Sequence, residues 1–160
     1  MKIKFFTTGG TIDKVYFDAR SEFEVGSPQV REVIDEANVT FAYDVESILR
    51  KDSLDMTDAD RELIRQRILA DPCPLIVVTH GTDTMVETAR ALGNISNKTV
   101  VLTGSMQPAR FRSTDAVFNI GCAIGVVQSR PPGVYIAMNG RVFRPDQTRK
   151  NREKNCFEEI

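Results

Sequence analysis

Residues 75–85 read LIVVTHGTDTM, and this stretch decides the fold class. Its first four residues, Leu75–Val78, are all apolar, so a strand formed by them is buried on both faces. Such strands are typical of parallel sheets, whose crossover helices cover both sides. The polar residues that follow, Thr79–Asp83, then lie where the strand gives way to a helix. The stretch therefore predicts a buried parallel sheet with polar side chains at the end of one strand.

Short apolar strands alternate with amphipathic helices through most of the chain. We predict strands at Ile3–Thr7, Phe41–Glu46, Leu75–Val78, Thr99–Thr103 and Val134–Met138. We predict helices at Pro28–Ala37 with proline in the first turn, from Thr57 onward, at Thr84–Leu92, and from Ser113 to Gln128. This order predicts an α/β protein with a doubly wound, mostly parallel sheet and helices on both faces, of the Rossmann/flavodoxin type.

The second and fourth predicted helices carry signals for their starts and buried faces. Thr57 and Asp60 have the spacing of a capping box, and Ser113 is expected to cap the fourth helix. Apolar residues at helical spacing predict the buried sides, which are Leu63, Ile64, Ile68 and Leu69 in the second helix and Val117, Ile120, Ile124 and Val127 in the fourth.

Length, charge and cysteine content narrow the function classes. The 160 residues fit one domain, 1–160, and the net charge of -1 gives no global attraction to nucleic acid or to an anionic membrane. No apolar run approaches the ~20 residues of a membrane helix, and the start KIKFFTT has no signal-peptide pattern. The 3 cysteines lie far apart and predict reduced thiols rather than disulfides or a zinc site. We therefore expect a cytoplasmic protein without a metal ion or other cofactor.

Glycine and polar residues follow the predicted strands. The strand ends read TTGGTID, THGTDT, TGSMQP and MNGRVF. Ligands of doubly wound sheets bind outside the carboxyl ends of the strands. The sequence therefore predicts a site at this edge.

The first strand end, Thr7–Asp13, offers a hydroxyl beside a flexible turn. Two adjacent glycines allow a sharp turn that exposes backbone N–H groups to a ligand, and Thr11 follows them. The stretch matches neither the GxGxxG dinucleotide motif nor a phosphate-binding GK[ST] loop. A plain Gly-Gly turn remains the simpler explanation of this stretch taken alone.

The second strand end has two competing explanations. Thr82, Asp83 or Thr84 could each cap the following helix, but a carboxylate there could also hold a ligand ammonium group. His80 directly follows a buried strand, which favours a structural core histidine over a general base. A threonine hydroxyl needs a base before it can attack an amide, and Lys150 or Tyr16 could supply one.

Two motifs together resemble a known family. TTGGTID and VVTHGTDTMVETA are similar to the two active-site signatures of the bacterial-type L-asparaginase/glutaminase family. KDSLDM, LTGSMQP, STDAVFN and RKNREKNCFEE resemble further segments of it. The resemblance covers nearly the whole chain and corresponds to the N-terminal domain of the usual two-domain enzyme.

The resemblance implies a role for each matching residue. Thr11 matches the threonine nucleophile, Thr82 the second threonine, and Lys150 the partner of that second threonine. Asp83 matches the ligand of the substrate's α-ammonium group. The remaining matches are positions expected to bind substrate, namely Gly10, Gly81, Ser53 for the α-carboxylate with Asp52 beside it, and Ser105, where the family has an alanine whose backbone approaches the side-chain amide. The implied reaction is hydrolysis of L-asparagine through an acyl-enzyme.

Three departures from the family pattern affect these expectations. The family's flexible-loop tyrosine aligns with Phe23, which has no hydroxyl, so we hypothesise that Tyr16 replaces it. Leu54 follows the substrate-binding serine where the family usually has a polar residue, which puts glutamine use in doubt. The family's C-terminal domain, which lends a glutamate to a neighbouring site, has no counterpart in 1–160. We therefore expect a homo-oligomer of a different kind, or a site closed by the chain's own loops.

Two other functions are compatible with the sequence. A non-catalytic amino-acid-binding module could keep the same pocket, although binding alone would not require the lysine base. The basic run at 141–154 could contact nucleic acid, but it has acidic neighbours and no aromatic platform, so a solvated face or subunit contact explains it better.

Overall fold

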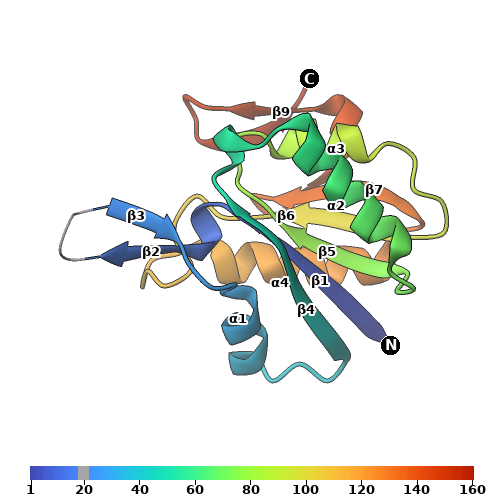
Figure 1. The fold of residues 1–160 in the computed structure, drawn as a ribbon, viewed down its shortest axis with the longest axis horizontal. Coiled ribbons are helices and arrows are strands. Elements are labelled where there is room, and N and C mark those ends of the chain that lie inside the picture. Colours follow the sequence, from blue (N-terminus) through green and yellow to red (C-terminus); the bar gives the residue numbers. More distant parts are fainter. Residues whose placement is uncertain (18–21) are drawn as a thin grey trace.

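The computed structural model describes residues 1–17 and 22–160, and its centre is one six-stranded sheet (Figure 1). The strand order is β4-β1-β5-β6-β7-β8. The bounds are β1 (Lys2–Gly9), β4 (Ala42–Lys51), β5 (Leu75–Thr79), β6 (Thr99–Thr103), β7 (Gly133–Met138) and β8 (Arg141–Phe143). The first five strands of this order are parallel, and β8 pairs antiparallel with β7. The predicted doubly wound, mostly parallel sheet is confirmed, in the flavodoxin-like order.

Helices cover both faces of the sheet, as expected. The helices α2 (Asp58–Ala70) and α3 (Met85–Leu92) pack on one face, and α1 (Val30–Glu36) and α4 (Ala116–Ser129) pack on the other (Figure 1). In β5, Ile76 and Val78 belong to the first core while Val77 belongs to the second, and all three are fully buried. The run of apolar residues at 75–78 arises because each face of this strand meets a different layer of helices.

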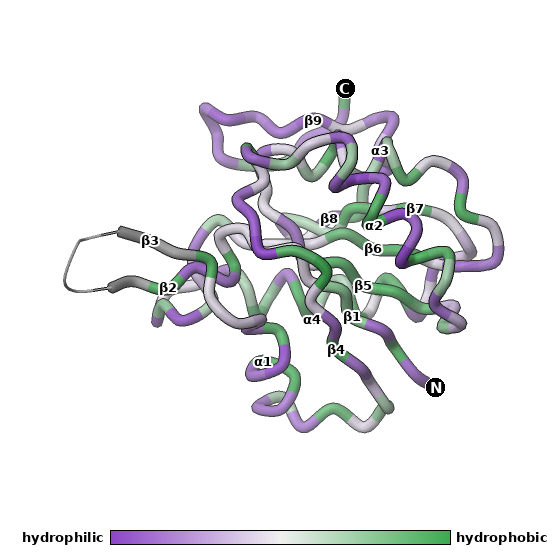
Figure 2. The backbone as a smooth tube through the Cα atoms, viewed as in Figure 1, coloured by the Kyte–Doolittle hydropathy of each residue, from purple (hydrophilic) through white to green (hydrophobic). Residues whose placement is uncertain are grey.

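Two hairpins outside the sheet were not predicted. They are formed by β2 (Lys14–Phe17) with β3 (Glu22–Val25), and by β9 (Thr148–Asn151) with β10 (Cys156–Glu159). Short 3-10 helices lie at Thr11–Asp13 (η1), Ser53–Asp55 (η2) and Pro145–Gln147 (η3). The strand β9 is largely hydrophilic, in contrast to β5 and β6 (Figure 2). The prediction of Val134–Met138 as the last strand was therefore wrong, because β8, β9 and β10 are too short and polar to show a strand pattern.

Two predicted helix starts were placed too early. The helix α1 begins at Val30, with Pro28 outside it and Gln29 at the N-cap. The helix α4 begins at Ala116, with Asp115 rather than Ser113 at the N-cap. The Asp115 carboxylate instead accepts hydrogen bonds from the backbone N–H groups of residues 106 and 107. The prediction that Ser113 caps this helix is therefore wrong.

The predicted buried faces of α2 and α4 are correct only in part. Ile64, Ile68, Ile120 and Val127 are buried, whereas Leu63, Leu69 and Val117 are 38%, 44% and 54% exposed. The predicted Ile124 is only partly buried, and the buried side of α4 also includes Ala116, Asn119, Ala123 and Val126. The apolar stripe read from the sequence is wider than the contact that each helix makes with one face of the sheet.

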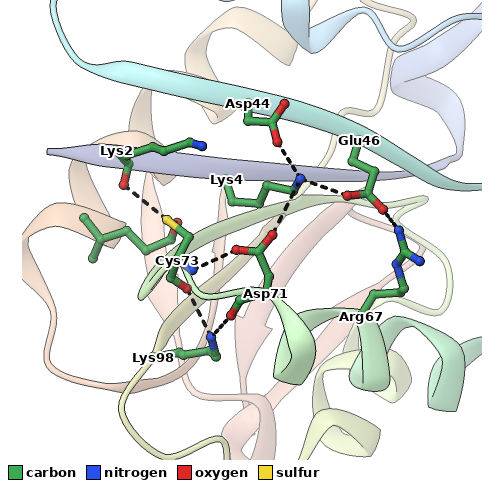
Figure 3. A network of polar contacts seen from close by, with 9 residues as sticks. Lys2, Lys4, Asp44, Glu46, Arg67, Asp71, Cys73 and Lys98 are labelled. Carbon is green, nitrogen blue, oxygen red and sulfur yellow. Dashed lines mark hydrogen bonds and ion pairs between the residues drawn. The ribbon is translucent and has the colours of Figure 1, made fainter.

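A buried lysine joins the first strand of the sheet to its neighbours (Figure 3). Lys4, 5% exposed, places Nζ 2.6 Å from Asp44, 2.8 Å from Glu46 and 3.6 Å from Asp71. An ammonium group removed from water requires such partners. Because Asp44 and Glu46 lie on β4 and Asp71 follows α2, this cluster connects three segments around the start of β1.

Asp13 ties the first strand end to α1 and to the β2–β3 hairpin. Its Oδ1 accepts a hydrogen bond of 2.8 Å from the backbone N–H of Gln29, and its carbonyl accepts one of 2.7 Å from the N–H of Gly26. Burial raises the pKa of Asp13 to about 7, although the Gln29 N–H and the Arg50 charge act in the opposite direction. The folded protein therefore favours the protonated carboxyl group.

The capping box at Thr57 predicts a first stability effect. Thr57 Oγ1 accepts from the Asp60 N–H, and the Asp60 carboxylate accepts from the Thr57 N–H at 2.8 Å. We expect Thr57→Ala to lower the free energy of unfolding by about 1 kcal/mol in urea titrations. Thr57→Ser keeps the hydroxyl and should remain near wild type. Equal loss in both variants would contradict a capping role.

A second prediction concerns Asp13 and pH. Because the pKa of Asp13 is raised on folding, the protonated carboxyl group contributes to stability. This contribution is fully present below the unfolded pKa of 3.8 and is lost as the pH rises through about 7. Asp13→Asn keeps an acceptor for the Gln29 N–H but cannot ionise. The stability of the variant relative to wild type should therefore rise by up to about 1.4 kcal/mol per pH unit between pH 4 and 7. A pH-independent difference in denaturant titrations would rule this out.

Candidate active site

The two motif threonines follow β1 and β5, the strands at which the strand order of the sheet changes direction. The chain builds β4 on one side of β1 and then β5, β6 and β7 on the other side. In doubly wound sheets, ligands bind outside the carboxyl ends of the strands at this point. Thr11 follows β1, and Thr82 follows β5. The topology therefore places the two motif threonines at the same edge of the sheet, after neighbouring strands.

Two glycines allow the loops at this edge of the sheet to pack closely against one another. A Cβ atom added to Gly10 would lie only 2.4 Å from Cα of Gly81, and one added to Gly81 would lie 2.6 Å from Oγ of Ser53. Gly10 also has a φ of 88°, which L side chains rarely adopt. Three of the predicted substrate-binding positions are thus in contact, and Thr11 and Thr82 each follow one of the two glycines.

Lys150 joins this cluster from the β9–β10 hairpin. Its Nζ donates to Oγ1 of Thr82 at 2.8 Å and lies 2.8 Å from Oδ1 of Asp83. The Lys150 side chain is 11% exposed and Thr82 is 4% exposed, so the ammonium–hydroxyl contact is largely shielded from water. Arg152 Nε also lies 4.0 Å from Oδ1 of Asp83. The fold therefore brings together three predicted catalytic residues that are up to 68 positions apart.

Ser53 presents a buried hydroxyl without a partner. It is 1% exposed, and its Oγ makes no hydrogen bond within the described part of the chain. Asp52 beside it is engaged elsewhere: it accepts from the Leu54 N–H and forms a 2.8 Å ion pair with Lys14. Burial raises the pKa of Asp52, but the bonds from Lys14 and Leu54 outweigh it and hold the pKa below its usual value. Asp52 therefore supports the loop, while Ser53 Oγ is available to a ligand.

Ser105 lies on the loop after β6. It is fully buried, and its Oγ donates to the carbonyl of Gln107 at 2.5 Å. The preceding glycine, Gly104, packs against the backbone of His80, since a Cβ atom there would lie 2.3 Å from the His80 carbonyl oxygen. The structure thus places the Ser105 loop directly against the second motif.

His80 is a buried structural residue, as its position after β5 predicted. Its exposure is 0%, and its Nδ1 lies 2.7 Å from the carbonyl oxygen of Gly81. Burial lowers its pKa to about 4, despite the opposing effect of the Gly81 carbonyl. The imidazole is therefore neutral at pH 7, with its Nδ1–H directed at the backbone.

Thr84 departs from its expected role as a helix cap. It occupies the N-cap position of α3, but its side chain makes no capping hydrogen bond. Its Oγ1 instead donates to the carbonyl of Ser53 at 2.7 Å. No local sequence signal indicates this bond, because its two residues are 31 positions apart and meet only through the fold.

The remaining predictions fall on the hairpin that follows Thr11. The backbones of Tyr16 and Phe23 pair directly across β2 and β3, but both side chains lie outside what the structure describes. Thr11 itself is half-buried at the start of η1. Within 1–17 and 22–160, no cluster of His, Cys, Asp or Glu has the arrangement of a metal site, and no helix has the length and apolarity needed to cross a membrane.

Comparisons with known proteins place this arrangement in a family. The family description "Asparaginase, N-terminal" matches residues 2–159. A glutaminase-asparaginase from Acinetobacter glutaminasificans is 31% identical over 154 residues, which cover 85% of this chain and 45% of that protein. The thermostable L-asparaginase from Thermococcus kodakarensis superposes with a TM-score of 0.87 and 27% identity, covering 100% of this chain and 51% of that one.

A third comparison agrees with these two. A probable cytoplasmic L-asparaginase from Campylobacter jejuni superposes with a TM-score of 0.77 and 28% identity, over 99% of this chain and 51% of that one. The chain thus spans about half the length of the relatives it matches. Because the family's N-terminal domain is matched from residue 2 to residue 159, and the fold agrees with solved asparaginases, the chain belongs to the asparaginase family.

Proposed function

We propose that this protein is an amidohydrolase that converts L-asparagine to L-aspartate and ammonia through a threonine acyl-enzyme. The observation that carries the proposal is the position of Lys150 Nζ, 2.8 Å from both Thr82 Oγ1 and Asp83 Oδ1. This set lies beside the contact of Gly10 with Gly81, which brings the Thr11 loop to the same crevice. A ligand-binding site would not need a lysine on a threonine hydroxyl, whereas a nucleophilic threonine needs a base.

The proposed reaction has two covalent steps. A threonine Oγ attacks the side-chain amide carbon of the substrate and passes its proton to a base. The base hands this proton to the amide nitrogen, and the C–N bond breaks as ammonia leaves. Water attacks the resulting ester, releases aspartate and restores the hydroxyl. Lys150, after losing its proton, is the proposed base for Thr82, and Tyr16 is the proposed base for Thr11. Which threonine attacks first is left to experiment.

The proposed substrate contacts use the charges and hydroxyls of the crevice. Asp83 binds the α-ammonium group, and because Lys150 and Arg152 both approach Oδ1, we expect the ammonium at Oδ2. Ser53 Oγ, buried and unpartnered among the described residues, binds the α-carboxylate. The backbone at Ser105 approaches the side-chain amide, with Gly10 and Gly81 lining the crevice.

Substrate range, compartment and assembly are part of the same proposal. Leu54 beside Ser53 is 64% exposed and offers no side-chain hydrogen bond, which supports asparagine over glutamine as the preferred substrate. The name of the Campylobacter relative includes "cytoplasmic", which supports the same compartment for this protein. We further propose a homo-oligomer.

Ammonia release from L-asparagine tests the proposal. Thr11→Ala and Thr82→Ala each remove one of the two proposed hydroxyl groups, and Lys150→Met removes the proposed base. Each variant should lower kcat by at least about a hundredfold. Thr40→Ala changes an exposed threonine outside the crevice and should behave as wild type. Circular dichroism would show that the inactive variants are folded.

Two further outcomes separate the alternatives. Mass spectrometry of acid-quenched, digested reactions should locate the acyl group on Thr11 or Thr82 and so identify the attacking residue. If wild type binds L-aspartate in calorimetric titrations but releases no ammonia, the protein is an amino-acid-binding module rather than an amidohydrolase.

A further inference from the structure

Thr84 makes a hydrogen bond that capping does not explain. Its backbone, with φ −123° and ψ 22°, differs from the extended conformation common at helix N-caps, and its hydroxyl does not satisfy the start of α3. The hydroxyl instead donates to the Ser53 carbonyl at 2.7 Å. The bond joins the second motif to the loop that carries the buried serine.

The Ser53 loop is held locally by hydrogen bonds to Asp52, since the Leu54 N–H donates to its Oδ1 and the Asp55 N–H to its carbonyl. The helix η2 is a single turn, in which the Met56 N–H donates to the same Ser53 carbonyl at 3.3 Å. The Lys14–Asp52 ion pair holds the loop before Ser53, and Gly81 contacts the serine side chain itself. The Thr84 hydroxyl makes a shorter hydrogen bond to the Ser53 carbonyl than the Met56 N–H does, and it ties this carbonyl to a different segment of the chain.

We infer that Thr84 is a positioning residue that holds Ser53 Oγ in place for recognition of a substrate α-carboxylate. This inference rests on the proposed function, in which Ser53 binds that carboxylate. A buried hydroxyl that has no protein partner binds a ligand well only when its position is fixed beforehand. Thr84 acts on substrate affinity through Ser53 and takes no part in the covalent steps.

Thr84→Val tests the inference, since valine keeps the shape of threonine without the hydroxyl. We expect KM for L-asparagine to rise about tenfold with little change in kcat, the effect of losing one hydrogen bond. L-Asparaginamide, in which the α-carboxylate is replaced by a neutral carboxamide, should show no such difference between wild type and variant. Thr84→Ser should restore the wild-type KM for L-asparagine.

A matched control lies one turn further along α3. The Thr88 hydroxyl contacts Met56 Sδ at 3.9 Å and not Ser53, so Thr88→Val should leave KM unchanged even if stability falls. An equal rise in KM for both substrates, or a lower melting temperature without any change in KM, would overturn the inference.

Two measurements distinguish failure of the inference from failure of the proposed function. If wild type releases no ammonia, calorimetry with L-aspartate and its α-carboxamide still applies, and Thr84→Val should weaken only the binding of L-aspartate. Hydrogen exchange needs no ligand: the amide of Met56 should exchange several-fold faster in Thr84→Val than in Thr84→Ser. Unchanged exchange, or a wild type that binds neither amino acid, would overturn the inference.

Discussion

The contact of Gly81 with two other loops is the constraint on which the candidate site depends. Its backbone meets Gly10 on one side and the Ser53 side chain on the other, at separations that leave no room for a Cβ atom. Backbone contact of this kind sets the spacing between the loops after β1, β4 and β5. This close approach of the three loops is possible because residues 10 and 81 have no side chains.

The lysine of the candidate site comes from outside the main sheet. The β9–β10 hairpin does not pair with the main sheet in the described parts of the chain, although Phe157 of β10 packs against Phe143 of β8. This hairpin places Lys150 on Thr82 and Asp83. Arg90 of α3 holds this segment by donating to the carbonyls of Pro145 and Thr148. The position of Lys150 therefore depends on hydrogen bonds from Arg90 and on the apolar packing of Phe157.

Buried ionisable groups near the sheet have mainly structural roles. His80 is neutral at pH 7 and bonded to the backbone, Asp13 favours its protonated form below about pH 7, and Lys4 forms ion pairs with three carboxylates. The lowered pKa of His80 makes the free energy of unfolding rise with pH between about 4 and 6.5, whereas the raised pKa of Asp13 makes it fall over the same range. The lone histidine, an obvious candidate for catalysis by composition, thus belongs to the framework.

Sequence alone determined the fold class and the main strands. The apolar run at 75–78 and the alternation around it require a sheet buried on both sides, because no other arrangement removes every residue of such a strand from water. The same reasoning located the polar strand ends, including Thr11 and Thr82, and named Lys150 and Tyr16 as possible bases. The resemblance to asparaginases then paired Lys150 with Thr82 and added Ser53. Local patterns failed at the helix starts and at the short polar hairpins, where propensity is weak and tertiary contacts decide.

Only the tertiary structure showed which side chains are in contact. The resemblance to asparaginases implied that Lys150 partners Thr82, 68 positions away, but nothing in the sequence indicated the bond from Thr84 to Ser53, 31 positions away. A one-dimensional pattern shows which residues can cap, bind or react, but not which partner each finds. Which partner a side chain finds depends on the strand order and on the close approach of the loops. For this reason Thr84, a candidate helix cap by sequence, bonds to Ser53 instead.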